Sequence, residues 1–98
     1  MKNYRQLFTF ARTALEKAYA PYSHFRVGAA IEADDGKVYA GCNVENVSYP
    51  CGTCAEAGAV AAMVCGGSAK IRRILVTSDG AALVAPCGAC LQRILEFS

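Results

Sequence analysis

Apolar residues follow two different periods along this chain, and each period predicts one kind of element. Between about Tyr4 and Tyr19 they recur every three or four positions, which is typical of a helix with one buried stripe. The stripe consists of Leu7, Phe8, Ala11, Leu15 and Ala18. The sequence Ala20-Pro21-Tyr22-Ser23 then breaks the helical pattern.

The next segment predicts a pair of strands. Residues 25–32 partly alternate and contain several small side chains, which indicates a strand pressed closely by its neighbours. Asp34-Asp35-Gly36 predicts a hairpin turn, because glycine tolerates the positive φ that such turns need. Residues 37–43 are therefore predicted to return as an antiparallel strand, followed by a polar loop over residues 44–53.

The second half predicts two further helices and one more strand. An Ala-rich stretch from Cys54 to about Cys65, ended by Gly66-Gly67, predicts a helix. The run Ile74-Leu75-Val76 predicts that a strand over residues 71–77 is covered on both faces, although it is expected at the sheet edge. Pro86 is predicted to open a last helix. The order α-β-β-α-β-α predicts one layered α/β domain over residues 1–98, with a helix crossing between parallel strands.

Composition narrows the range of functions. The net charge of the 98 residues is only +2, and no run of Lys or Arg predicts binding to a nucleic-acid polymer. No apolar run approaches membrane-spanning length and the N-terminus does not resemble a signal peptide, so we expect a cytoplasmic protein that does not bind membranes. The hydrophobic share of 54% predicts either very tight packing or association with further copies of the chain.

Three cysteines and one glutamate have the pattern of a catalytic metal site. Cys87 and Cys90 have the spacing at which two sulfurs bind one ion, and Cys54 supplies a third sulfur from a distant segment. Three protein ligands leave the fourth position of a tetrahedral zinc open, and Glu56 follows Cys54 closely enough to work beside it. Both cysteine segments fall at predicted helix N-termini, where the helix dipole favours thiolates.

Other interpretations of the cysteines remain open at this point. Cys51 and Cys54 form a second C-x₂-C pair, so a structural four-cysteine zinc site is an alternative. A disulfide framework is disfavoured because no export signal is present. The placement of Cys54 and Cys90 on predicted helices, and the presence of Glu56, favour the catalytic site. We interpret Cys42 and Cys65 as small buried hydrophobic residues.

Five ordered motifs resemble those of the short, three-cysteine cytidine deaminases. The motifs are Pro21-Tyr22-Ser23-His24-Phe25, Gly28-Ala29-Ala30, residues 41–46 (Gly-Cys-Asn-Val-Glu-Asn), Cys54-Ala55-Glu56 and residues 86–90 (Pro-Cys-Gly-Ala-Cys). The resemblance implies a three-layer α-β-α fold with a small mixed sheet. It also implies hydrolysis of cytidine or deoxycytidine to uridine or deoxyuridine and ammonia, in pyrimidine salvage.

The resemblance assigns roles to individual residues. It implies Zn²⁺ bound by Cys54, Cys87 and Cys90, with Glu56 moving protons between an activated water, N3 of the base and the leaving amine.

The substrate contacts that it implies come from four further residues. Phe25 is expected to pack against the pyrimidine, the backbone N–H of Ala55 to hold the base carbonyl, and Asn43 and Glu45 to bind the ribose hydroxyls. A carboxylate at Glu45 would repel a phosphate, which favours free nucleosides as substrates. Tyr49 matches a residue at a subunit boundary of these enzymes, and a homotetramer is the expected assembly.

The sequence departs from the family in three places. Many members have Arg where this chain has Ala57 and Leu91, and without those cations we expect more negative charge on the thiolates and reduced activity. Gln92 matches the family and is able to donate to a thiolate. The chain also lacks the family's C-terminal strands, as a C-terminally truncated member would. Alternatives are a deaminase of another aminopyrimidine nucleoside, such as a blasticidin-type antibiotic, and a catalytically weak zinc-binding oligomerisation module.

Overall fold

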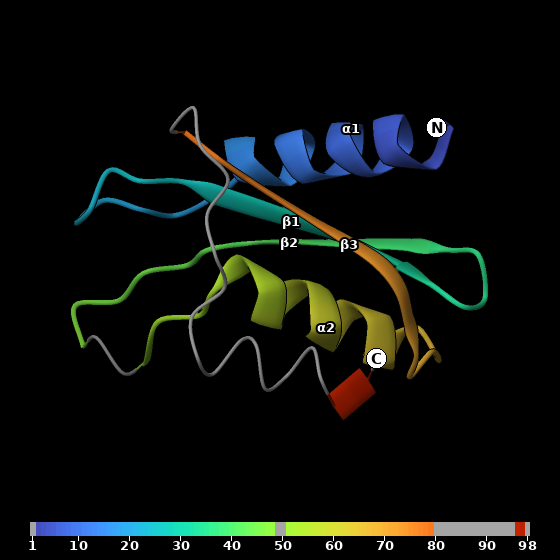
Figure 1. Cartoon of the computed structure of the whole chain (residues 1–98). Coiled ribbons are helices and arrows are strands. Elements are labelled where there is room, and N and C mark those ends of the chain that lie inside the picture. The colour runs from blue at the N-terminus through green and yellow to red at the C-terminus, as the bar shows by residue number, and fades with distance from the viewer. Residues whose placement is uncertain (1, 49–50, 80–95, 98) are drawn as a thin grey trace.

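The fold places a helix on each face of a central sheet (Figure 1). The structure, a computed structural model, describes residues 2–48, 51–79 and 96–97. Its elements in chain order are α1 (Lys2–Glu16), β1 (Val27–Ala33), β2 (Val38–Cys42), α2 (Ala55–Cys65) and β3 (Ile71–Ser78). In Figure 1, α1 lies above the sheet and α2 below it. The predicted α-β-α layering is therefore confirmed.

The three strands lie in the order β2-β1-β3, and β1 pairs antiparallel with both of its neighbours. Strands β2 and β3 consequently run in the same direction, with β1 between them, and α2 connects them. The predicted helical crossing is therefore present, because α2 connects two strands that run in the same direction. These two strands are not paired with each other, and every pairing within the described part of the sheet is antiparallel. As predicted, β3 lies at an edge of the described sheet.

Alternation along β1 separates two hydrophobic clusters. Ala29, Ile31 and Ala33 face α2, where they pack with its buried residues. Ala30 faces the other way and packs with Leu7 and Ala11 of α1. Because β1 is the central strand, side chains on both of its faces are buried, which explains the apolar and small residues that form it.

The edge strand β3 contributes to both clusters. Ile74 and Val76 pack against the α2 side of the sheet, whereas Leu75 packs against the α1 side. All three side chains are half-buried. The prediction that this apolar run is covered on both faces is confirmed, and the remaining exposure follows from the edge position of the strand.

The first helix differs from its prediction at two points. Phe8 is predicted in the buried stripe but is 50% exposed, because from Arg5 to the end of α1 only Leu7, Ala11 and Leu15 turn fully toward the sheet. The helix also ends at Glu16 rather than near Tyr19. The amides of Lys17 and Ala18 bond to carbonyls three residues back, and Tyr19 leaves the helix altogether.

Two cysteines differ from the interpretation as buried hydrophobic residues. Cys65 is exposed and Cys42 is only half-buried. Cys65 is the last residue of α2, and Val64, Gly66 and Gly67 beside it are exposed as well, so this end of the helix lies at the surface. The hairpin turn is as predicted, with Gly36 at φ 83°.

Most of the predicted last helix, from Pro86 onward, lies outside the described residues. Glu96 and Phe97 are helical, and Phe97 packs against the cluster on the α2 side of the sheet. In the part of the chain that the structure describes, no helix is both long enough and apolar enough to cross a membrane.

Glycine at position 58 is expected to cost stability without serving the packing. A Cβ atom there would lie 3.6 Å from the Cα of Gly41 and 3.7 Å from the carbonyl oxygen of Cys42, which are ordinary van der Waals distances. Since glycine within a helix is less favourable than alanine by about 1 kcal/mol, we expect Gly58→Ala to raise the free energy of unfolding by about that amount. Urea unfolding measures the change, and a loss of stability would contradict the prediction.

Candidate active site

Three segments that are distant in sequence meet at one end of the sheet. Val44 and Thr53 exchange two backbone hydrogen bonds of 2.9 and 2.8 Å, so the residue before Cys54 is paired with the loop that follows β2. On the other side of this loop, the amide of Tyr19 donates to the carbonyl of Asn43 and the amide of Glu45 donates to the carbonyl of Tyr19. Asn43 and Glu45 are thereby held beside the start of α2.

The predicted motif Cys54-Ala55-Glu56 forms the start of α2. Cys54 is the N-cap, with extended backbone angles of −75° and 155°, and its side chain is half-buried. Ala55 and Glu56 begin the helix and are buried, Glu56 with only 5% of its surface exposed. The first amides of a helix have no partners within it, so this end of α2 favours a negatively charged group such as a thiolate.

Of the three predicted zinc ligands, the structure describes only Cys54. Cys87, Cys90 and Tyr49 lie outside the described residues. Among the residues it describes, no three or more His, Cys, Asp or Glu residues are grouped so as to hold a metal ion. The part of the site that is described nevertheless fits zinc, because a sulfur at a helix N-terminus is a suitable ligand and a buried carboxylate follows it. Cys51, the ligand that the structural alternative requires, is exposed.

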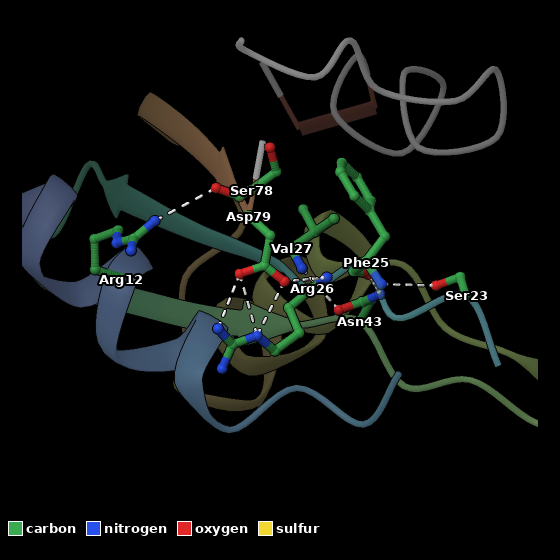
Figure 2. Close-up of polar contacts among 8 residues, drawn as sticks. All are labelled: Arg12, Ser23, Phe25, Arg26, Val27, Asn43, Ser78 and Asp79. Carbon is green, nitrogen blue, oxygen red and sulfur yellow. Dashed lines mark hydrogen bonds and ion pairs between the residues drawn. The ribbon is translucent and has the colours of Figure 1, made fainter. Parts of the chain in front are cut away.

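The side-chain amide of Asn43 binds the backbone that leads into β1 (Figure 2). Its Oδ1 accepts from the N–H of Val27 at 2.9 Å, and its Nδ2 donates to the carbonyl of Phe25 at 2.9 Å. Phe25, the predicted contact for the pyrimidine ring, is 39% exposed. The structure therefore brings Asn43 and Phe25 together. The second Nδ2 proton of Asn43 is not used by these two bonds.

Glu45 binds the turn that precedes Phe25. Its Oε1 accepts from the backbone amides of Tyr22 at 3.0 Å and Ser23 at 3.1 Å, and its Oε2 accepts from the hydroxyl of Ser23. The hydroxyl of Ser23 lowers the pKa of Glu45 most, followed by the amide of Ser23. The carboxylate is thus stabilised in its charged form.

We expect the contribution of Glu45 to folding to depend on pH. Because its pKa in the folded state lies below its ordinary value of 4.5, Glu45 stabilises the fold above that pH, and the stabilisation is lost as the pH falls through the folded-state pKa. The Tm difference between the protein and Glu45→Gln should therefore shrink below pH 4.5. Thermal unfolding followed from neutral to acidic pH measures this difference.

Ser23→Ala provides the control for this titration. It keeps the carboxylate but removes the hydrogen bond that lowers its pKa most, so the loss of stabilisation should begin at a higher pH than in the protein. A Tm difference for Glu45→Gln that is independent of pH would contradict the expected linkage.

Sequence reasoning missed Arg26 and Asp79 as parts of this region. Their side chains form an ion pair with an Nη2–Oδ1 distance of 2.9 Å, and both are partly exposed. The pair ties the segment before β1 to the end of β3, as Figure 2 shows. An arginine and an aspartate separated by 53 positions give no periodic signal, so only the sheet register, in which Val27 faces Ser78, reveals them as neighbours.

A hollow of about 370 Å³ lies elsewhere on the molecule, between α1 and β2. It is lined by Phe10, Thr13, Ala14, Lys17, Ala40, Gly41 and Cys42. None of the predicted site residues lines it, so the candidate active site is the junction of Phe25, Asn43, Glu45 and the start of α2.

Comparison with known sequences identifies the family of this chain. Residues 1–98 match the family described as the cytidine and deoxycytidylate deaminase zinc-binding region. The chain is 45% identical over 92 residues to the cytidine deaminase of Sporosarcina psychrophila, covering 94% of this chain and 68% of that protein. It is 44% identical over 86 residues to the cytidine deaminase of Mycobacterium tuberculosis H37Rv, covering 88% and 65%. The chain thus spans about two thirds of the length of these relatives.

Solved structures give the same result for the fold. The crystal structure of cytidine deaminase from Mycobacterium tuberculosis superposes with a TM-score of 0.90 at 41% identity, covering 96% of this chain and 76% of that one. Cytidine deaminase from Burkholderia pseudomallei superposes with a TM-score of 0.89 at 45% identity, covering 95% and 75%.

Proposed function

Because this chain belongs to the family of the cytidine and deoxycytidylate deaminase zinc-binding region, we propose that it hydrolyses the exocyclic amine of cytidine or deoxycytidine. The products would be uridine or deoxyuridine and ammonia. The observation that carries the proposal is the buried carboxylate of Glu56, in the first turn of the helix that Cys54 caps. Burial of this carboxylate beside a proposed metal ligand supports a role for it in proton transfer.

The residues of this chain would divide the reaction among them. Cys54, Cys87 and Cys90 would hold zinc, which when bound supplies a Lewis acid that lowers the pKa of a water. Glu56 would take a proton from the water that attacks C4 and give it to N3. It would then move the proton of the new hydroxyl to the amine, which leaves as ammonia.

Recognition of the nucleoside would fall to the segments beside α2. The exposed ring of Phe25 would pack on the pyrimidine, and the N–H of Ala55 would bind its carbonyl oxygen. Asn43 and the charged carboxylate of Glu45 would bind the ribose hydroxyls, and Glu45 would repel a phosphate there. Free nucleosides are therefore the proposed substrates.

Two features of the chain modify the proposal. Ala57 occupies a half-buried position in the first turn of α2, where a relative with arginine would place a cation near the thiolates, so we expect slower turnover than in such relatives. Large apolar side chains are exposed on the described surface, among them Phe8, Phe10, Tyr22 and Val47, and association into a homo-oligomer such as a tetramer would cover some of them.

One assay tests the activity and the metal together. We expect the purified, zinc-loaded protein to convert cytidine to uridine, seen as a loss of absorbance, and to turn over cytidine 5′-monophosphate at least about tenfold less efficiently, a difference of about 1.4 kcal/mol. A zinc chelator should abolish turnover, and added zinc should restore it.

A pair of cysteine variants separates the catalytic site from the structural alternative. Cys54→Ser should lose bound zinc, whereas Cys51→Ser should keep both zinc and activity, because the proposed site does not include the exposed thiol of Cys51. Loss of zinc from Cys51→Ser would favour the four-cysteine site. One zinc per chain without turnover of any pyrimidine nucleoside would favour the binding module.

A further inference from the structure

The backbone that carries Phe25 is bound at every polar group. The N–H of Phe25 donates to Oγ of Ser23 at 3.1 Å, and its carbonyl accepts from Nδ2 of Asn43 at 2.9 Å. The N–H of Val27 donates to Oδ1 of Asn43, and the carbonyl of Val27 accepts from the amide of Asn43 at 3.1 Å. Three of these four bonds use side chains of residues outside the segment.

Arg26 lies between Phe25 and Val27, and both of its backbone polar groups bind Asp79. The N–H of Arg26 donates to Oδ2 of Asp79 at 2.9 Å, and the amide of Asp79 donates back to the carbonyl of Arg26 at 3.0 Å. The guanidinium of Arg26 donates to both carboxylate oxygens through Nε and Nη2. This pairing lowers the pKa of Asp79 and raises that of Arg26, chiefly through the hydrogen bonds between the two side chains.

The residues that precede Phe25 are also held in place by hydrogen bonds. His24 has a φ of 59°, a left-handed conformation that is uncommon outside glycine, and its amide donates to the carbonyl of Ala20 at 3.0 Å. The hydroxyl of Ser23, which accepts from Phe25, donates in turn to the carboxylate of Glu45. One chain of hydrogen bonds therefore runs from Glu45 through Ser23 to the backbone of Phe25.

These hydrogen bonds fix the backbone of a residue whose aromatic ring is substantially exposed. Phe25 is 39% exposed, although a phenyl ring gains free energy from burial. A mobile segment would let such a ring fold back onto the protein surface, and a ligand would then have to restore its orientation on binding. A backbone that is bound at each polar group removes the backbone's share of that cost in advance.

We infer that Ser23 and Asp79 are positioning residues for nucleoside binding, which fix the backbone that presents the Phe25 ring to the pyrimidine. The inference rests on the proposed function. It assigns to the Arg26–Asp79 pair a role beyond surface stability, to which an exposed ion pair contributes little.

The test compares two disruptive variants with matched controls. Asp79→Ala and Ser23→Ala each remove a side chain that binds the segment, whereas Asp79→Asn and Ser23→Thr keep an acceptor for the same amide. Asp34→Ala removes an exposed aspartate from the turn at the far end of β1 and β2, so it controls for the change in charge. Steady-state kinetics on cytidine give KM and kcat, and amide hydrogen exchange by NMR reports on residues 25–27 directly.

A loss of positioning affects binding more than the chemical step. We expect KM for cytidine to rise roughly tenfold in Asp79→Ala and Ser23→Ala, with kcat within about twofold of the protein's value. Asp79→Asn and Ser23→Thr should recover most of the loss, and Asp34→Ala should match the protein. Amide exchange of Phe25 should accelerate in Ser23→Ala, and that of Arg26 in Asp79→Ala.

Failure of the inference and failure of the proposed function give different results. If the unmodified protein shows no Glu56-dependent turnover, the proposed function fails, and the inference with it. If the protein is active and KM is unchanged in both disruptive variants, only the inference is overturned. Fast exchange of the amides of residues 25–27 in the unmodified protein would overturn it whatever the activity.

Discussion

Glu56→Gln is expected to lower kcat for cytidine by about 10²–10⁴-fold while leaving the fold intact. The amide has nearly the same shape as the carboxylate but is unable to take a proton from water or deliver one to N3. Glu56 is 5% exposed, so no other solvent-borne base easily replaces it. Because the substitution preserves the volume and shape of the buried side chain, we expect the Tm of this variant to stay close to that of the protein.

Glu32 provides a matched control, because it is the other buried glutamate among the described residues. It lies on β1 opposite Arg73 and forms ion pairs with Arg73 and, at 3.6 Å, with Arg72. Glu32→Gln removes the charge from these pairs, so we expect a loss of about 1–3 kcal/mol in the free energy of unfolding and an unchanged kcat. The two substitutions should therefore have opposite effects on stability and activity.

Steady-state kinetics and urea unfolding of both variants measure these effects. Turnover by Glu56→Gln within a few-fold of the protein would refute the role of Glu56 as a proton shuttle. A large fall in kcat for Glu32→Gln would show instead that removing the charge of a buried glutamate lowers activity indirectly, by disturbing the fold.

The sequence was most informative where a local pattern decides the structure. The helix that begins after Cys54 and ends at Gly66-Gly67, and the hairpin at Gly36, follow from spacing and from glycine's conformational freedom. The layering also follows, because β1 is apolar on both faces and therefore has to be covered on both.

These local patterns do not predict contacts between segments that are distant in the sequence. The pairing of Arg26 with Asp79 depends on the register between β1 and β3, which no local signal sets. Asn43 and Glu45 were identified by resemblance as ribose contacts, and nothing in their spacing indicated that both also bind the backbone around Phe25. Phe8 satisfied the helical period and yet is exposed, since the period does not reveal how wide the covered stripe of α1 is.

Gly41→Ala is expected to destabilise the protein by about 3 kcal/mol, at the upper end of the range for an overpacked core. A Cβ atom at Gly41 would lie 2.4 Å from the amide nitrogen of Ala59 and 2.5 Å from the carbonyl oxygen of Ala55. These are backbone atoms of α2, so no side chain is able to rotate away and the helix itself has to shift.

The same shift should reduce activity, because the displaced helix begins with Ala55 and Glu56. A displacement of about 1 Å at a catalytic group is able to cost about 10²-fold in rate, so we expect kcat to fall by up to that factor even under conditions where the variant remains folded. Gly58→Ala is the matched control, since it adds the same methyl group from the opposite side of this contact at ordinary distances. If Gly41→Ala were as stable and as active as Gly58→Ala, close packing of α2 on β2 would not be what positions Glu56.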